Sequence, residues 1–172
     1  MTHEHEDASG VYLRSLGVVD ANVFVAAVMQ GEAAHAAAIS FFQTAGGLSA
    51  SSQLGMVHVP EIWFLECAGA LNRAAQKGRL QASDVEPRLD QIEQLVRYTA
   101  VSVWDVWAES SREIVRLALC YRCTVPDACY LYLAKDLAAP LITCESPSSG
   151  LPKAARAAGV AAISPADWQL PS

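Results

Sequence analysis

The stretch GVVDANVFV, at residues 17–25, passes from apolar residues to an acid and back to apolar residues. Its first two valines are typical of the end of a buried strand, and residues 23–29, which contain no Pro or Gly, predict a helix. Asp20 would then lie at the carboxyl end of the first strand, the edge at which open α/β sheets bind ligands. On this stretch alone, Asp20 is either a helix cap or a metal ligand.

Composition limits the function classes. The chain has 172 residues, a length that fits one domain, and 52% of them are hydrophobic, which is ample for a single core. The formal net charge of −6 excludes a strongly basic nucleic-acid-binding protein. It does not exclude nucleic acid as a substrate, because a bound metal or a local basic patch can supply positive charge on an acidic protein. It also suits a basic protein partner.

The cysteines and the N-terminus indicate the compartment. Five cysteines, an odd number, predict small hydrophobic side chains in a reducing environment rather than a disulfide framework. Cys120 and Cys123 form an isolated CxxC, but a zinc site usually needs a second pair of ligands, and the histidines show no such spacing. Residues 1–8 are polar and acidic, unlike a signal peptide, and no apolar run approaches the about 18 residues that span a bilayer. We therefore expect a cytoplasmic protein with no membrane segment.

Predicted strands and helices alternate along the chain. Strands are expected to end at Asp20 and to lie at 57–59, 100–103, 140–143 and 160–163. Helices are expected at 23–29, 32–44, 61–77, 83–97, 107–121, 124–137 and 153–158. This alternation predicts an α/β fold, a three-layer α/β/α sandwich with a mostly parallel central sheet. The domain is expected to span 17–166, between a flexible N-terminal extension at 1–16 and a C-terminal tail at 167–172.

Local signals set several of these boundaries. Gly46 and Gly47 are expected to stop the helix before them, and Pro60 is expected in the first turn of the helix that follows it. The sequence SDVE at 83–86 has the form of a capping box, with Ser83 as the cap. Loops are expected at 48–56 and 144–152.

Acidic residues accompany most of the predicted strands. They are Asp20 after the first strand, Glu66 two turns into the helix after the second, Asp105 after the third, Asp127 at a helix start and Glu145 after the fourth. Parallel strands bring their carboxyl ends to one edge, so these carboxylates could meet and raise each other's pKa values. Mg²⁺ and Mn²⁺ relieve such repulsion, prefer carboxylate oxygens and activate water for phosphodiester hydrolysis. Each acid alone also has a structural explanation, as a helix cap or as an exposed loop residue.

Five short segments occur in a characteristic order: VDANV at 19–23, Pro60 with Glu66 six residues later, VPDA at 125–128, LYLA at 131–134 and LITCE at 141–145. Together they resemble a PIN domain, and in particular the VapC toxins of bacterial toxin–antitoxin pairs. The resemblance covers about residues 17–166. It implies that Asp20, Glu66 and Asp127 bind Mg²⁺ or Mn²⁺, and that Asn22 and Thr143 hold the neighbouring acids in place.

The segment Thr143-Cys144-Glu145 departs from the family pattern, in which an Asp stands two residues after the Thr. Glutamate keeps the charge but adds a methylene, which moves the carboxylate by roughly 1.5 Å. Catalytic geometry is sensitive to displacements of about that size. Glu145 therefore either completes the catalytic metal site with altered geometry or leaves that site weakened. Asp105 is left outside the site.

Two functions are consistent with the resemblance. The first is a metal-dependent endoribonuclease, the toxin of a type II toxin–antitoxin pair, for which the family implies an RNA substrate, a metal-activated water, a cognate antitoxin and a homodimer. The second is a catalytically impaired PIN-fold module that binds a protein or RNA without cleaving it. A haloacid-dehalogenase-like phosphatase is disfavoured, because it needs a second Asp where this chain has Asn22. Candidate phosphate contacts are Arg14, Arg73, Lys77, Arg79, Arg122 and Lys153.

Overall fold

The computed structural model describes residues 14–50, 55–106 and 108–169. Their strands form a sheet of five parallel strands in the order β3-β2-β1-β4-β5. These strands are β1 (Arg14–Val19), β2 (Gly55–Pro60), β3 (Val101–Trp104), β4 (Leu141–Ile142) and β5 (Ala162–Ile163). The chain runs outward from β1 to β3 on one side and from β4 to β5 on the other. The strand order therefore reverses between β1 and β4, where open α/β sheets bind ligands.

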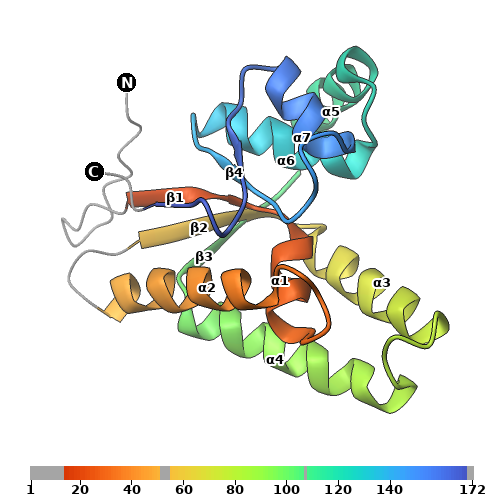
Figure 1. Cartoon of the computed structure of the whole chain (residues 1–172). Coiled ribbons are helices and arrows are strands. Elements are labelled where there is room, and N and C mark those ends of the chain that lie inside the picture. The colour runs from red at the N-terminus through yellow and green to blue at the C-terminus, as the bar shows by residue number, and fades with distance from the viewer. Residues whose placement is uncertain (1–13, 51–54, 107, 170–172) are drawn as a thin grey trace.

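Helices cover both faces of this sheet (Figure 1). One layer holds α1 (Ala21–Val28), α2 (His35–Ala50), α3 (Trp63–Gln76) and α4 (Val85–Tyr98), with the short 3₁₀ helix η1 (Ala82–Asp84) before α4. The other layer holds α5 (Ala108–Tyr121), α6 (Val125–Asp136) and α7 (Gly150–Ala157). The predicted three-layer α/β/α architecture with a mostly parallel sheet is therefore confirmed. Within the described ranges, no helix is long and apolar enough to cross a membrane.

A cluster of aromatic rings joins the first helical layer. The ring of Phe24 on α1 lies 4.7 Å from the rings of both Phe42 on α2 and Trp63 on α3. All three side chains are buried, and each such ring contact adds about 0.5–1.5 kcal/mol beyond the burial itself. The cluster fixes the position of α1, and with it the position of Asp20 directly before that helix.

Gly17 permits the close approach of β1 and β4. Its φ is +138°, and a Cβ at this position would lie 2.9 Å from the carbonyl oxygen of Pro140. The positive φ and the nearby carbonyl oxygen would each make a side chain at this position costly, so glycine is favoured here. The two strands then pair in register at their carboxyl ends. As a result, Asp20 and Thr143, which directly follow the paired residues, lie at the ends of adjacent strands.

The boundaries of α2 differ most from the sequence prediction. The helix begins three residues later than expected and continues through Gly46 and Gly47, so the predicted stop at the two glycines is wrong. Gly46 is buried, and a Cβ there would overlap the ring of Tyr98 at the end of α4. Packing against that ring gives this glycine a tertiary role, which local helix propensity does not reveal.

Three other local predictions are wrong. Pro60 ends β2, where it pairs with Trp104, and does not open a helix. The predicted capping box does not form, because Ser83 lies within η1 and α4 begins after Asp84 without a side-chain cap bond. The elements α2, β2 and α7 extend into the two segments predicted as loops. At Pro60, pairing with β3 sets a boundary that local residue types did not predict.

Both ends of the domain differ slightly from the predicted limits. β1 begins at Arg14, within the predicted N-terminal extension. Trp168, in the predicted C-terminal tail, packs its ring 4.9 Å from that of Phe41 and donates a hydrogen bond from Nε1 to the carbonyl oxygen of Leu16 at 3.1 Å. The rest of the predicted extension, residues 1–13, and the last residues of the tail, 170–172, lie outside the described part of the chain.

The cysteines are free thiols, as predicted. Cys67 and Cys129 are buried, which suits the prediction of small apolar side chains. Burial raises the pKa of Cys129 to about 11 and that of Cys144 to about 12, so both stay protonated at neutral pH.

Candidate active site

Asp20 lies between the end of β1 and the start of α1. Its backbone is extended, and its Oδ1 accepts a hydrogen bond from the backbone N–H of Asn22 at 3.4 Å, so Asp20 caps α1. This bond is at the long end of the hydrogen-bonding range. Only 7% of Asp20 is exposed. A helix cap does not require such burial, which is unusual for a carboxylate without a charged partner.

Both predicted positioning residues, Asn22 and Thr143, contact Asp20 directly. The Thr143 hydroxyl donates to Oδ2 of Asp20 at 2.8 Å, and Nδ2 of Asn22 donates to the same oxygen at 2.6 Å and to the Thr143 hydroxyl at 3.1 Å. Backbone N–H groups complete the network: that of Cys144 donates to Oδ1 of Asn22 at 2.9 Å, and that of Glu145 donates to the Thr143 hydroxyl at 3.2 Å. The network ties the ends of β1 and β4 together and holds the Asp20 carboxylate in one orientation.

The electrostatic surroundings of Asp20 disfavour its charged form. Burial raises its pKa from 3.8 to about 7. The hydrogen bond from Thr143 opposes this shift, whereas the negative charges of Glu145 and Glu66 add to it. Near neutral pH, a proton therefore competes with any cation for this carboxylate.

Glu66 is half-buried on the first turn of α3. Burial raises its pKa, the nearby hydroxyl of Tyr130 opposes the rise, and the charge of Asp127 adds to it. Oε2 of Glu66 and the hydroxyl of Tyr130 are buried, and neither makes a hydrogen bond of good geometry with a described residue. A buried oxygen without a partner costs about 1–3 kcal/mol. This oxygen is therefore available to a ligand.

Asp127 has both a structural role and a place beside the other acids. It forms a capping box at the start of α6: its N–H donates to the hydroxyl of Thr124, and its Oδ2 accepts from the Thr124 N–H, both at 3.2 Å. A Cβ built on Gly150, at the start of α7, would lie 3.5 Å from the same Oδ2. The carboxylate of Asp127 therefore also faces the N-terminal end of α7, which follows the Glu145 loop.

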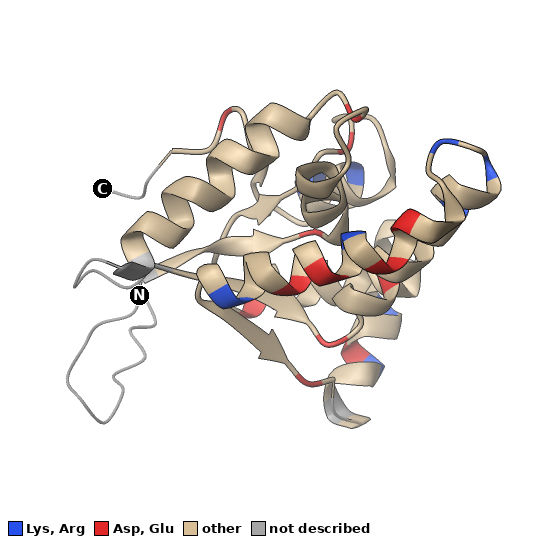
Figure 2. Cartoon of the chain, turned by 90° about the horizontal axis from the view of Figure 1, so that it is seen from below, with Lys and Arg blue, Asp and Glu red and all other residues tan. Residues whose placement is uncertain are grey.

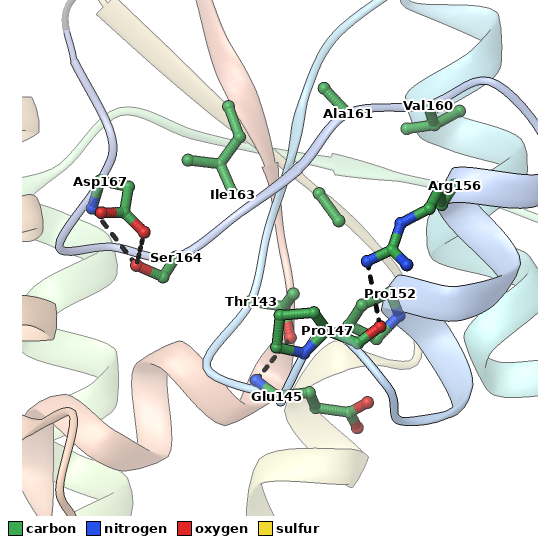
Figure 3. Close-up of a pocket in the computed structure, with 11 residues that line it drawn as sticks. Thr143, Glu145, Pro147, Pro152, Arg156, Val160, Ala161, Ile163, Ser164 and Asp167 are labelled. Atoms are coloured by element: carbon green, nitrogen blue, oxygen red, sulfur yellow. Dashed lines mark hydrogen bonds between the residues drawn. The ribbon is translucent and has the colours of Figure 1, made fainter.

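Glu145 is exposed in the loop between β4 and α7 (Figure 3). Its side chain extends toward the α7 side of the cavity drawn there. Its Oε2 lies 2.8 Å from the hydroxyl of Ser149, which donates to this oxygen or to the carbonyl oxygen of Ser146 at 2.7 Å. This contact holds the longer side chain that stands in place of the usual Asp.

Electrostatic interactions link the four predicted acids: the charges of Glu145 and Glu66 raise the pKa of Asp20, and those of Asp127 and Glu145 raise the pKa of Glu66. Figure 2 shows acidic positions after the strand arrowheads. Within the described ranges, no Lys or Arg forms an ion pair with Asp20, Glu66, Asp127 or Glu145. Among the same residues, no group of three or more His, Cys, Asp or Glu side chains is placed to hold a metal ion as it stands. The carboxylate of Asp127 is held by the backbone N–H of Thr124, and that of Glu145 by the hydroxyl of Ser149, so both would have to rotate to share an ion with Asp20.

Three residues of this site were not identified from the sequence. Thr124 could have been found from the T-x-x-D form of a capping box. Ser149 follows Glu145 by four residues, a spacing that gives a weak signal in a segment expected to be a loop. Tyr130 lies in an apolar helical run and gives no signal at all. Asp105 is exposed after β3, which β2 separates from β1, and it was predicted to lie outside the site.

Two cavities lined by described residues reach Glu145. One, of about 470 Å³, lies beside β5 and α7, and Thr143, Arg156 and Ile163 are among its lining residues (Figure 3). The other, of about 400 Å³, lies between α1 and α3 and includes Asn22. Glu145 therefore faces open space on two sides.

A parallel sheet between two helical layers defines an α/β protein, and here Asp20 and Glu145 follow the two strands between which the strand order reverses, where open α/β sheets bind ligands. The PIN domain family model matches residues 17–146, which is most of the chain. The chain therefore belongs to the PIN domain family, and the resemblance predicted from the sequence is confirmed. No curated protein sequence matches this chain.

Two solved structures resemble the chain. PAE2754 from Pyrobaculum aerophilum is 16% identical, with a TM-score of 0.59, over 94% of this chain and 91% of that one. VapC20 from Mycobacterium tuberculosis, a sarcin-ricin loop cleaving toxin, is 18% identical, with a TM-score of 0.56, over 83% of this chain and 95% of that one. At these identities, the likeness shows the fold.

Proposed function

We propose that this chain is a Mg²⁺- or Mn²⁺-dependent endoribonuclease. The observation that carries the proposal is a pair of carboxyls, Asp20 and Glu66, whose pKa values are both raised by burial and by neighbouring acids, and which have no ion pair with a described Lys or Arg. Asp20 lies at the reversal of strand order, a position that suits a ligand site. Membership of the PIN domain family supports a nuclease.

The donor set fits a divalent cation. Asp20, Glu66 and Asp127 would hold it, and Glu145 would complete the set. All of these donors are carboxylate oxygens, which suit Mg²⁺ or Mn²⁺. Oε2 of Glu66 is already buried without a hydrogen bond among the described residues. Releasing Asp127 from its capping box costs about 1 kcal/mol, which the binding of a divalent ion can offset.

The chain's own residues prepare the site for hydrolysis. A bound cation of this kind lowers the pKa of a water and stabilises the charge that develops on the phosphate. Thr143 and Asn22 keep the Asp20 carboxylate in one orientation, so little reorganisation is needed when the substrate arrives. Ser149 holds Oε2 of Glu145, and Oε1 is left without a hydrogen bond to a described residue. That second oxygen is free to accept a proton from the attacking water.

We further propose that the chain is the toxin of a type II toxin–antitoxin pair that acts on RNA in the cytoplasm. The support is the similarity of its fold to VapC20, which is described as a toxin that cleaves the sarcin-ricin loop. A cognate antitoxin would place a basic side chain beside the four acids, which lack such a partner among the described residues. A homodimer is proposed by analogy with the family.

One observation favours a second function. As they stand, the described acids do not converge on a single ion, and Glu145 replaces the usual Asp. A PIN-fold module with impaired chemistry would bind RNA or a protein without cutting it. The two functions differ in metal affinity, because an impaired site binds divalent cations weakly.

The test is cleavage of an RNA panel that contains transfer RNA, ribosomal hairpins and unstructured oligomers, with Mn²⁺, Mg²⁺ or EDTA. Asp20→Asn and Glu145→Asp are run beside the wild type. Asp90→Asn, which makes the same change at an exposed position on α4, is the control. We expect cleavage that needs metal, survives in the control and is lost in Asp20→Asn. If the wild type and Glu145→Asp both leave every RNA intact, the binding module is the better account.

A further inference from the structure

The cavity between α1 and α3 has an acidic end and a basic end. Asn22, Cys144 and Glu145 line the end at the proposed active site, and Arg73, Lys77 and Arg79, with the single acid Glu32, line the other end. We propose that this cavity binds the phosphate backbone of the RNA strand that leads away from the cleavage site. The inference rests on the proposed function and assigns the substrate track of that same site.

The geometry of α3 places the cations along the path from the acids. Arg73 and Lys77 follow Glu66 by seven and eleven residues, spacings that return to the same face of a helix. At 1.5 Å per residue, they lie about 10 Å and about 16 Å along the helix from Glu66. At about 3.4 Å per nucleotide step, these distances match about three and about five stacked nucleotides. The two charges can therefore contact successive parts of one strand.

The side chain of Arg73 turns back toward the acidic end. A Cβ built on Gly69, one helical turn nearer to Glu66, would lie 3.2 Å from Nη1 of Arg73. Because Gly69 has no side chain, the guanidinium can lie along α3 between the two ends of the cavity. An arginine in this position can take a phosphate bidentately.

Arg73 and Lys77 are the cations available to a ligand. Both are exposed, and neither forms an ion pair within the described ranges, although the charge of Arg73 lowers the pKa of Glu66. Arg79 is already paired with Glu32 at 2.9 Å, so its charge is partly neutralised. Figure 2 shows Lys and Arg positions in the turn between α3 and α4, at the far end of this face.

The other candidate phosphate contacts are less well placed. Arg122 and Lys153 are exposed on the α5–α7 layer and do not line this cavity, and the side chain of Arg14 lies outside the described residues. A polyanion that approaches a protein of net charge −6 needs such a local cationic anchor. The walls of the cavity also include the small side chains of Ala26, Ala70 and Ala74, which leave room for sugars.

The test is the salt dependence of binding of a fluorescein-labelled single-stranded RNA, measured by anisotropy in EDTA so that no cleavage occurs. The proteins are the wild type, the double variant Arg73→Gln/Lys77→Gln and the double variant Arg97→Gln/Arg116→Gln, which removes two exposed arginines on α4 and α5 and serves as the charge-matched control. Each lost phosphate contact should reduce the slope of log K against log salt by about 0.7, or about 1.4 for both. The double variant should therefore bind about tenfold to thirtyfold more weakly at about 0.1 M salt, whereas the control should match the wild type. Arg73→Lys/Lys77→Arg, which keeps both charges, should retain the slope.

Two results would overturn the assignment: the double variant binding with the affinity and slope of the wild type, or a wild type that does not bind RNA. Cleavage with Mn²⁺ is measured separately. If the wild type binds RNA through this cavity but cuts none, the assignment of the cavity stands and the proposed nuclease activity is refuted. If the wild type cuts RNA but the double variant binds it as well as the wild type does, only the assignment of the cavity is refuted.

Discussion

Replacing Asp20 with Asn should stabilise the metal-free protein at neutral and alkaline pH. The pKa of Asp20 rises from 3.8 to about 7 in the fold, because burial disfavours the charge. A shift of about three units is worth about 4 kcal/mol once the carboxyl is ionised. Asparagine has no such cost, and its oxygen can still accept from Thr143 and Asn22 at the position of Oδ2. Loss of the cap bond at 3.4 Å destabilises the variant by about 1 kcal/mol, so its free energy of unfolding should exceed that of the wild type by about 2–3 kcal/mol.

The pH dependence has a definite sign. Below about pH 4, the carboxyl is protonated in both the folded and the unfolded chain, so the variant and the wild type should differ little. Between about pH 4 and about pH 7, only the folded wild type keeps the proton, so its free energy of unfolding falls as pH rises. Above about pH 7 the difference is constant. Thermal unfolding in EDTA should therefore give the variant a melting temperature about 5–10 °C higher at pH 8.

Added Mn²⁺ supplies the control within the same assay. It should raise the melting temperature of the wild type by mass action and have little effect on that of Asp20→Asn. The difference between the two melting temperatures should therefore shrink or change sign. A variant that is no more stable than the wild type at pH 8 in EDTA would refute the reasoning. So would a difference in stability that does not change between pH 4 and pH 8.

Three further predictions follow from single contacts. Gly47→Ala should raise the free energy of unfolding by about 0.5–1 kcal/mol, because Gly47 lies within α2 with open space around it. Gly46→Ala should not raise it, because the added Cβ meets the ring of Tyr98. Equal increases for the two variants in urea denaturation would contradict this prediction. Thr143→Val removes a bond that favours ionised Asp20, so the pH at which cleavage rises should move upward, and an unchanged pH–rate profile would count against that role. Ser149→Ala should leave stability within about 0.5 kcal/mol but slow cleavage about tenfold by releasing Glu145; a rate equal to that of the wild type would show that the hydroxyl does not position this acid.

The sequence predicts the architecture of the site better than its contacts. The alternation of strands and helices, with acids after the strands, is enough to place Asp20 and Glu145 at one edge of a parallel sheet. It does not give the strand order. Only the order β3-β2-β1-β4-β5 makes the ends of β1 and β4 neighbours, and this neighbourhood allows Thr143 to donate to Asp20. The two explanations of Asp20 also prove compatible, since it caps α1 and is buried among the other acids.

The missed features depend on tertiary contacts. Gly46 and Gly47 are helix breakers by propensity, yet α2 continues through them because the ring of Tyr98 from α4 fills the space at Gly46. The extra methylene of Glu145 can be read from the sequence, but the hydroxyl of Ser149 that holds it cannot. Local residue types therefore located the acids, and only the packed structure shows what restrains each one.

The most direct test of the central claim is calorimetric titration of the purified protein with Mn²⁺ at pH 8, without RNA. The account predicts one bound ion per chain in the wild type and in the control Asp90→Asn, and loss of that binding in Asp20→Asn. Protein that binds no Mn²⁺, or that binds it equally well without the Asp20 carboxylate, would contradict a metal-dependent active site built on these four acids.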